Sequence, residues 1–293
     1  MTPDDFKPFP VPVVAALVGP GSHEEDEALG YLPMPSGMST YTPPPLPERD
    51  AFVVHRGAVQ ALHEALDALR RPGAVDTTQT IDLSGLDDGE RRLLNQVLGE
   101  GEVAAQVRGG DGTTQVQIQE SVFAGLWRVI HLRDGAVVRD SMEVGAVPGP
   151  VLEAAREDGF APRAPFGPAP EGAMNAPSLL VEIEDRQRRW HAGQPAHVIN
   201  LTLLPLTPAD SQHLDAELGA GRVLILSRGY GNCRVANTRL PRTWRVTYFN
   251  SQDIVILDTL EIGRVPEVAC AALEDLEDSA ERIAEVLEWV EGR

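Results

Sequence analysis

An internal repeat constrains this chain more than any other feature of its sequence. The hexamer LGEGEV at residues 98–103 recurs as LGAGRV at residues 218–223, 120 positions later. Further blocks recur in the same order, including LWRV as TWRV and MEVGAVP as LEIGRVP. A nearly constant period with small offsets indicates one duplicated structural unit with loop insertions. We therefore predict two copies of one unit, over residues 57–155 and 178–272.

Each copy shows the same succession of local patterns. A helical pattern is followed by a short strand, then by a second helix that begins at a capping-box sequence, Asp87 with Glu90 or Thr207 with Asp210. Four strand-like runs separated by glycine-rich turns come next. The sequence thus predicts an α+β fold, built by internal duplication of a helix–strand–helix–antiparallel meander unit.

Composition divides the chain into four parts. Residues 1–50 are rich in proline and are predicted to form an extended, disordered tail. Residues 51–155 hold copy one, residues 156–177 form a proline-rich linker, and residues 178–293 hold copy two with an acidic C-terminal helix. The apolar stripe of that helix favours packing on its own domain, with another chain as the alternative.

Charge and composition exclude several classes of protein. The 293 residues include 25 Lys and Arg against 44 Asp and Glu, a formal net charge of −19. Nucleic acids and anionic membranes attract clustered cations, so neither is expected as a partner. No apolar run reaches the roughly 18 residues of a membrane span. The start MTPDDFKPFP lacks the basic region of a signal peptide. We expect a cytoplasmic protein without membrane insertion.

The sequence offers little that resembles an active site. LGEGEV lacks the lysine and hydroxyl residue of a phosphate-binding loop, and LGAGRV runs into a strand-like segment. The seven histidines form no HxH, HxxxH or HExxH pair, and two cysteines are too few for a protein-only zinc site. We expect no cofactor, no metal and no catalytic residue.

Cys233 is the one candidate for reactive chemistry. In the stretch SRGYGNCRV it lies between Arg228 and Arg234, and nearby cations lower the pKa of a thiol. The alternating pattern around it is equally typical of a strand residue that faces a core. No histidine is adjacent to act as a base, so a thiol-dependent enzyme stays open only as an alternative.

Two segments have the composition of a protein-binding surface. The strand-like run TWRVTYFN brings aromatic side chains and an arginine together, and the tail segment TYTPPPLPE is expected to form a stiff polyproline helix. Interfaces concentrate binding energy in aromatic and cationic side chains. The candidate partner-binding residues are Tyr41, Pro43, Pro44, Pro45, Leu46, Tyr230, Cys233, Arg234, Tyr248, Phe249 and Asn250.

Five phrases, in order along residues 38–272, carry a family resemblance: TYTPPPLPE, LLNQVLGEGEV, IQESVFAGLWRV, SRGYGNCRV and TWRVTYFNSQDIVILDTLEI. They resemble the hydrogenase expression/formation proteins of the HupH/HyaF/HoxQ type. The resemblance implies a cytoplasmic accessory factor for uptake nickel–iron hydrogenases. Such factors attend the iron–sulfur small subunit before its export through the twin-arginine route. The resemblance carries no catalytic residue over to this chain.

These observations lead to one functional prediction and two alternatives. We predict a non-enzymatic maturation chaperone that binds the hydrogenase small-subunit precursor, with other hydrogenase accessory proteins as further candidate partners. An acidic chaperone suits a precursor whose export signal begins with a basic region. The alternatives are a thiol-dependent enzyme of iron–sulfur cluster assembly or repair that uses Cys233, and a structural adaptor between accessory factors.

Overall fold

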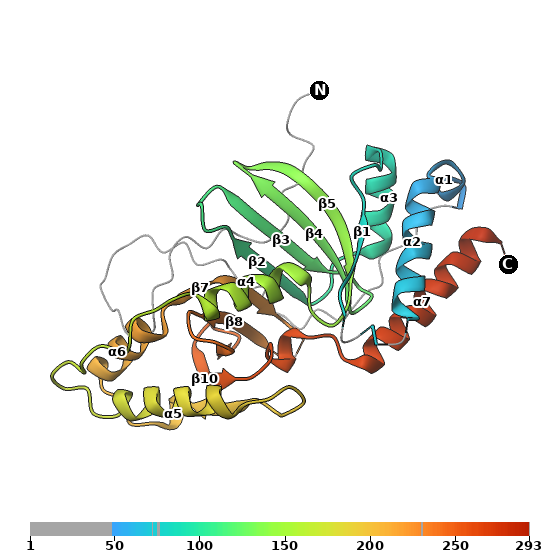
Figure 1. Ribbon diagram of the computed structural model, residues 1–293. Coiled ribbons are helices and arrows are strands. Elements are labelled where there is room, and N and C mark those ends of the chain that lie inside the picture. Colours follow the sequence, from blue (N-terminus) through green and yellow to red (C-terminus); the bar gives the residue numbers. More distant parts are fainter. Residues whose placement is uncertain (1–48, 72, 75–76, 230, 293) are drawn as a thin grey trace. The chain divides into compact units, whose positions relative to one another are not determined.

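The structure is a computed structural model that describes residues 49–71, 73–74, 77–229 and 231–292. The described part is a mixture of helices and antiparallel strands, so the predicted α+β class is confirmed (Figure 1). The tail predicted over residues 1–50 lies outside the described residues except for its last two positions.

Helices and strands follow one another in nearly the same order in both halves of the chain. The first half contains α1 (Arg49–Val54), α2 (Arg56–Leu69), β1 (Gln79–Asp82), α3 (Asp88–Leu98), β2 (Val103–Arg108), β3 (Thr114–Glu120), β4 (Leu126–Arg133), β5 (Ala136–Val144) and α4 (Gly149–Phe160). The second half contains α5 (Ala176–Arg189), β6 (His197–Asn200), the 3-10 helix η2 (Leu201–Leu203), α6 (Pro208–Leu218), β7 (Ala220–Ser227), β8 (Asn232–Thr238), β9 (Thr243–Phe249), β10 (Val255–Ile262), the 3-10 helix η3 (Glu267–Ala269) and α7 (Leu273–Glu291).

The described chain forms two compact units. The first unit contains the described residues of 49–152, 227–229 and 267–292, and the second contains 153–226 and 231–266. Helix α7 follows the second set of strands in the sequence but belongs to the first unit. Helix α4 follows the first set of strands, and most of it, from Glu153 onward, belongs to the second unit. The helix that follows each set of strands is therefore exchanged between the units.

The five strands of each unit are arranged in the same order. The order is β1-β5-β4-β3-β2 in the first unit and β6-β10-β9-β8-β7 in the second, so counterparts occupy equal positions. Strands β3 to β5 and β8 to β10 are antiparallel neighbours. The last hairpin of each unit also carries one extra residue, Val138 in β5 and Ile256 in β10. The two units therefore share a β-bulge as well as a strand order.

Helices α3 and α6 begin at their predicted capping boxes. The Asp87 side chain accepts a hydrogen bond from the Glu90 N–H at 2.8 Å, and the Glu90 side chain accepts one from the Asp87 N–H at 3.1 Å. Thr207 and Asp210 form the same reciprocal pair, at 3.0 Å in both directions. Because the first turn of a helix has N–H groups without internal partners, these side chains fix where α3 and α6 start.

The repeated hexamers are the ends of those two helices. Leu98 and Leu218 are buried, at 2% and 3% exposure, and each is followed by a glycine that ends the helix. Gly99 and Gly219 have φ angles of 56° and 61°, a region that favours glycine. The chain then enters β2 or β7, as the sequence predicted.

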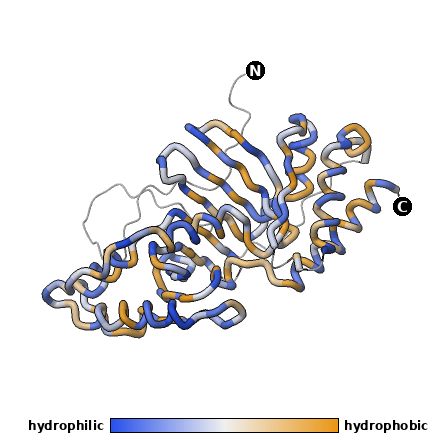
Figure 2. Tube along the Cα trace, viewed as in Figure 1, coloured by the Kyte–Doolittle hydropathy of each residue, from blue (hydrophilic) through white to orange (hydrophobic). Residues whose placement is uncertain are grey.

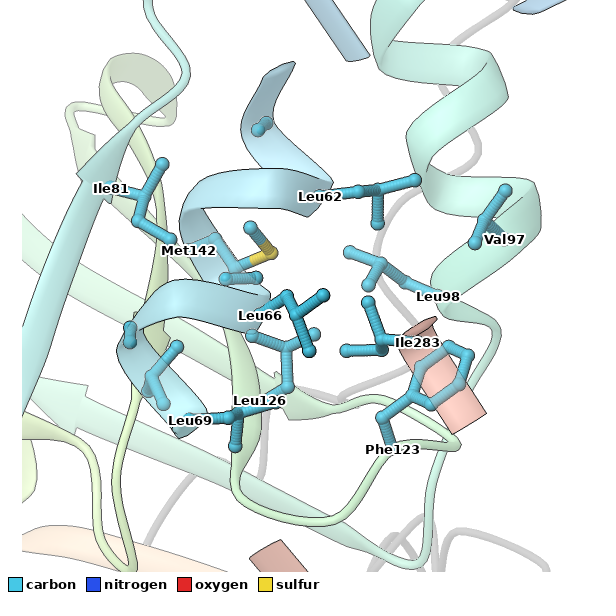
Figure 3. Packing of buried hydrophobic residues seen from close by; sticks show 14 of the residues in the cluster. Leu62, Leu66, Leu69, Ile81, Val97, Leu98, Phe123, Leu126, Met142 and Ile283 are labelled. Atoms are coloured by element: carbon cyan, nitrogen blue, oxygen red, sulfur yellow. The ribbon is translucent and has the colours of Figure 1, made fainter. Parts of the chain in front are cut away.

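The core of the first unit lies between its strands and helices α2, α3 and α7. Figure 3 shows Leu62 and Leu66 of α2 beside Leu98 of α3, Leu126 of β4 and Ile283 of α7. These side chains belong to one buried cluster, in which Leu62 and Ile283 have no exposed surface. Burial of this apolar face stabilises the unit and holds α2 and α7 side by side (Figure 1).

Polar contacts also attach α7 to the first unit. The Ser279 hydroxyl donates to the Ala124 carbonyl oxygen at 3.0 Å, and the Arg282 guanidinium donates to the Val122 carbonyl oxygen at 3.0 Å. The same guanidinium lies 5.0 Å from the ring centre of Phe123. Figure 2 shows that hydrophobic and hydrophilic residues alternate along α7, as expected for an amphipathic helix with one buried face.

The second unit has a separate hydrophobic core, and it also contains most of α4, a helix from the first half of the chain. Leu180 and Ile183 of α5 pack with Leu214 of α6 and Leu260 of β10. Helix α4 is attached to this unit through Arg222 of β7. The Asp158 carboxylate accepts from the Arg222 backbone N–H and from its Nε, both at 2.7 Å, and Glu157 accepts from Nη2 at 2.6 Å.

The predicted linker of residues 156–177 is partly helical. Its first residues complete α4, which continues to Phe160, and its last two belong to α5, which starts at Ala176. Residues 161–175 between the helices contain neither helix nor strand. Pro162 lies two residues after the end of α4, and proline cannot continue a helix.

Candidate functional site

Four of the five candidate residues in the described part of the chain lie on strands β8 and β9 of the second unit, and Asn250 follows β9. The register pairs Cys233 with Tyr248 and Arg234 with Thr247. Because side chains alternate between the faces of a sheet, Cys233 and Tyr248 lie on one face, and Arg234 and Phe249 on the other. The guanidinium carbon of Arg234 lies 5.7 Å from the ring centre of Phe249. The predicted anchors therefore do not share one surface.

The environment of Cys233 does not suit a nucleophile. The side chain is 1% exposed, and burial raises the pKa of the thiol to about 12, with Glu261 adding to the rise. Arg234 lies on the opposite face of the sheet. The sequence left two interpretations of Cys233 open. The structure agrees with a buried strand residue and contradicts a thiol pKa lowered by neighbouring arginines.

Tyr248 is half-buried beside the cysteine. Burial, with smaller contributions from the adjacent Cys233 and from Glu261, raises the pKa of its phenol to about 12. The phenol is therefore a neutral hydrogen-bonding group at physiological pH. Its partial exposure is compatible with the predicted role as a binding anchor.

Asn250 holds the turn between β9 and β10. Its side-chain oxygen accepts hydrogen bonds from the N–H groups of Gln252 at 2.8 Å and Ile254 at 3.0 Å. Its own N–H donates to the Ile254 carbonyl oxygen at 2.9 Å. These bonds occupy the Asn250 side-chain oxygen, so this residue fixes the shape of the hairpin tip.

Six of the candidate residues lie outside the described part of the chain. They are Tyr41, Pro43, Pro44, Pro45, Leu46 and Tyr230. Their predicted contribution to partner binding stays a prediction.

The tip of the β9–β10 hairpin exposes apolar side chains that the sequence analysis did not single out. Ile254, Val255 and Ile256 are 57%, 42% and 57% exposed. Leu203 of η2 is 78% exposed, and η2 is held beside β10 by a 2.8 Å hydrogen bond from the Asp258 N–H to the Thr202 hydroxyl. Ile254, Val255, Ile256 and Leu203 are called the hairpin surface below.

The outer edge of β10 is only partly paired. Strand β6 pairs with Thr259–Ile262 and leaves residues 255–258 without a strand neighbour on that side in the described part of the second unit. The available signal was the sequence DIVILD, four consecutive apolar residues between two aspartates. Such a run is typical of a strand, but periodicity does not reveal that its beginning lies uncovered at a sheet edge.

The equivalent hairpin of the first unit also exposes apolar side chains. Val137 and Val138 of β5 are 45% and 57% exposed. The first unit has two smaller apolar side chains where the second has the three of Ile254–Ile256. The hairpin surface is therefore the larger of the two apolar tips.

The described residues contain neither a metal-binding cluster nor a helix able to span a membrane. No group of three or more His, Cys, Asp or Glu side chains in this part could hold a metal ion. No described helix is both long and apolar enough to cross a bilayer.

Comparison with known proteins gives a consistent result. The family model of the C-terminal conserved region of HupH hydrogenase expression proteins matches residues 56–162 and again residues 173–290. The two matches cover both halves of the chain.

Similar proteins come from several bacteria. The hydrogenase expression/formation protein HoxQ of Cupriavidus necator is 53% identical over 96% of this chain and 98% of its own length. HupH of Rhodobacter capsulatus is 47% identical over 93% and 95%, and the hydrogenase-1 operon protein HyaF of Escherichia coli is 32% identical over 94% and 95%. A solved HupH structure from Thiobacillus denitrificans is 33% identical and covers 40% of this chain and 96% of its own, with a TM-score of 0.35.

Proposed function

Because the chain belongs to the family of hydrogenase expression/formation proteins, we propose that it binds the iron–sulfur small-subunit precursor of an uptake nickel–iron hydrogenase. The family supports a role in hydrogenase maturation. Binding takes place in the cytoplasm, before export of the precursor by the twin-arginine route, and involves no catalytic step by this chain.

The observation that carries this proposal is the hairpin surface. Adjacent exposed apolar side chains on a structured hairpin mark interaction sites more often than isolated ones do. Phe249 pairs with Val255 across the hairpin and adds a half-buried ring beside it. Rigid apolar and aromatic anchors of this kind supply most of the binding energy in protein interfaces.

Charge supports the choice of partner. The net charge of −19 favours association with a basic segment, and the resemblance implies a client whose export signal begins with a basic region. Long-range attraction would speed the encounter, and the hairpin surface would provide the short-range contacts.

The alternatives receive less support. A thiol-dependent enzyme needs a reactive Cys233, whose pKa burial raises to about 12. A structural adaptor between accessory factors would use the same kind of apolar surface, so the experiment must separate it from a chaperone by the identity of the captured chain.

The test is capture of a small-subunit precursor by the purified full-length chain. We compare wild type with Ile254→Ser/Ile256→Ser and with the matched first-unit variant Val137→Ser/Val138→Ser. Loss of two anchors at about 1 kcal/mol each weakens binding roughly thirtyfold for the hairpin-surface variant. The first-unit variant and Cys233→Ser are expected to capture precursor as wild type does.

Other outcomes would contradict parts of the proposal. Equal capture by wild type and the hairpin-surface variant would reject the surface. Capture of other accessory proteins without precursor would favour the adaptor. Loss of function in Cys233→Ser with an intact fold would favour the enzyme.

We also infer that the two units derive from one duplicated ancestor. The equal strand order, the shared bulge, the paired capping boxes and the two matches to one family model support this inference. An experimental structure in which Trp127 fails to overlay Trp244, or Gly99 to overlay Gly219, would contradict it.

A further inference from the structure

An arginine on β9 of the second unit is fully paired with acids. Arg245 donates to Asp258 of β10 from Nε at 3.0 Å and from Nη2 at 2.6 Å. Its Nη1 donates to Asp215 of α6 at 2.5 Å. Each guanidinium nitrogen thus has a carboxylate partner. The two carboxylates accept hydrogen bonds from all three guanidinium nitrogens of this half-buried arginine, so it needs no ligand to complete its pairing.

The first unit repeats the strand pair but leaves the arginine incompletely paired. Arg128 of β4 donates from Nη2 to Asp140 of β5 at 2.7 Å. Its Nε and Nη1 have no hydrogen-bond partner among the described residues, although Arg128 is only 7% exposed. Oδ1 of Asp140 is unpaired as well, and in the second unit the equivalent oxygen, Oδ1 of Asp258, accepts from Nε of the equivalent arginine. The donor that still needs an acceptor is Nη1.

Helix α3 brings a second cation to this cluster in place of a second acid. Nε of Arg91 lies 3.6 Å from the same Asp140 oxygen that Arg128 contacts. Arg91 also reaches Asp88 at 3.4 Å, but that carboxylate is 70% exposed and solvent screens the pair. The repeat places Asn95, 120 positions before Asp215, at the equivalent point of α3. Compared with the second unit, the first unit lacks one carboxylate.

We propose that the first unit binds a carboxylate-bearing ligand at Arg128 and Arg91. The ligand takes the position that Asp215 occupies in the second unit, on Nη1 of Arg128, and Asp140 keeps the guanidinium oriented. Burying an arginine without full pairing is costly, and a charge-assisted hydrogen bond from a carboxylate removes that cost. Burial lowers the pKa of Arg128, Asp140 opposes this fall without cancelling it, and Arg91 adds to it. An added negative charge would act in the same direction as Asp140.

The same chemistry is available from two sources. A free small acid carries a carboxylate, and so does an acidic side chain of a bound protein segment. Both would meet the same two cations, so the inference is independent of the client proposed above.

Acetate is the probe for the site. The full-length chain, labelled with nitrogen-15, is titrated with sodium acetate against sodium chloride at constant ionic strength, and the Nε–H resonance of Arg128 is followed. We expect a saturable acetate-specific shift in wild type. Asn95→Asp supplies the missing carboxylate from the exposed face of α3, so acetate should bind it at least about tenfold more weakly. Asn95→Ala is the matched control and should respond as wild type does.

The second unit provides the reciprocal variant. Asp215→Asn removes the acid from Nη1 of Arg245 and should make the Arg245 resonance sensitive to acetate, which it is not in wild type. This variant keeps the test decisive if Asn95→Asp does not fold. No acetate-specific shift of Arg128, or equal shifts in wild type and Asn95→Asp, would overturn the proposal. The absence of an acetate-specific shift of the Arg245 resonance in Asp215→Asn would overturn it too.

A peptide arm identifies the source of the carboxylate. Acetyl-Gly-Glu-Gly-amide is compared with the same peptide carrying Gln in place of Glu. A Glu-specific shift of Arg128 supports a protein ligand at this site. A response to acetate but not to the Glu peptide supports a small acid there. A response to both peptides alike, with none to acetate, would reject carboxylate recognition.

Discussion

Glu120 ends strand β3 in the first unit with its side chain only 7% exposed. Burial raises the pKa of this carboxyl to about 7, and Glu102 and Asp275 contribute to the rise. The backbone N–H groups of Gly125 and Val103 act in the opposite direction and are outweighed. A carboxyl that titrates near neutral pH makes the stability of the fold depend on pH.

The sign of that dependence follows from the raised pKa. The folded chain holds the proton more tightly than the unfolded chain, whose pKa is near 4.5. The contribution of Glu120 to stability is therefore complete below about pH 4.5, declines as pH rises to about 7, and is absent above. We expect Glu120→Gln to be more stable than wild type at pH 8, by at most about 3 kcal/mol.

Urea unfolding of the wild type and of Glu120→Gln at pH 5, 6, 7 and 8 measures this effect. The difference between variant and wild type should grow with pH up to about pH 7, because Gln does not titrate. A difference that stays constant over this range would show that Glu120 has an ordinary pKa.

Residue-level predictions from sequence succeeded where the cause is local. The capping boxes at Asp87 and Thr207 depend on a partner three residues away, so their geometry can be predicted from spacing. The chemistry of Cys233 depends on which sheet face it occupies and on what covers that face. Strand alternation alone would have separated it from Arg234. The unpaired nitrogens of Arg128 depend on α3, which spacing does not place against β4.

At the scale of elements, α7 shows the limit of an amphipathic pattern. The sequence predicted the helix and its apolar stripe, and Leu276, Ile283 and Leu287 of that stripe are buried. Leu273, at the start of the stripe, is 49% exposed. A stripe indicates that a face is covered but not which element covers it. The structure shows that α2 and the first-unit core cover it.

Ile283→Ala tests this packing. Ile283 has no exposed surface, so truncation leaves a cavity in the first-unit core and should cost about 3 kcal/mol. Hydrogen exchange should show lower protection in α2 of the first unit and unchanged protection in α5 of the second. Glu281→Ala, on the exposed side of the same helix, is the matched control and should change neither. A loss of protection confined to α5 would contradict the assignment of α7.

The strands were predictable as elements, but their exposure was not. The run Ile254–Leu257 reads as a buried strand because it lacks polar alternation. The start of β10 is uncovered because β6 is too short to pair with it. The length of a neighbouring strand is a tertiary property, so the hairpin surface appears only in the structure.

At the scale of the whole molecule, the repeat predicted two copies but not the exchange of helices between them. The predicted division kept α7 with residues 178–293, whereas the structure assigns it to the first unit. The N–H of Ala271 donates to the carbonyl oxygen of Ala146 at 3.0 Å, which leads α7 into that unit. Each half of the chain thus supplies one helix to the unit built mainly from the other half.

This exchange has a consequence for a chain cut between its halves. Residues 161–175 contain neither helix nor strand, so a protease site placed within residues 168–171 leaves α4 and α5 intact. After cleavage, the carboxyl-terminal fragment still provides α7 to the first-unit core, and the amino-terminal fragment still provides Asp158 of α4 to Arg222 of the second unit. We expect the two fragments to stay together in gel filtration under native conditions and to separate in urea.

The variants of α7 show whether the exchanged helix is the cause. In the cleaved chain, loss of about 3 kcal/mol at Ile283→Ala should weaken fragment association by roughly a hundredfold, because packing lost from the core is now packing lost between fragments. Glu281→Ala should leave association unchanged. Fragments that separate without urea would mean that the halves fold independently. Helix α7 contributes apolar burial to the first-unit core. If Ile283→Ala left fragment association unchanged, α7 would therefore not be the element that joins the two fragments.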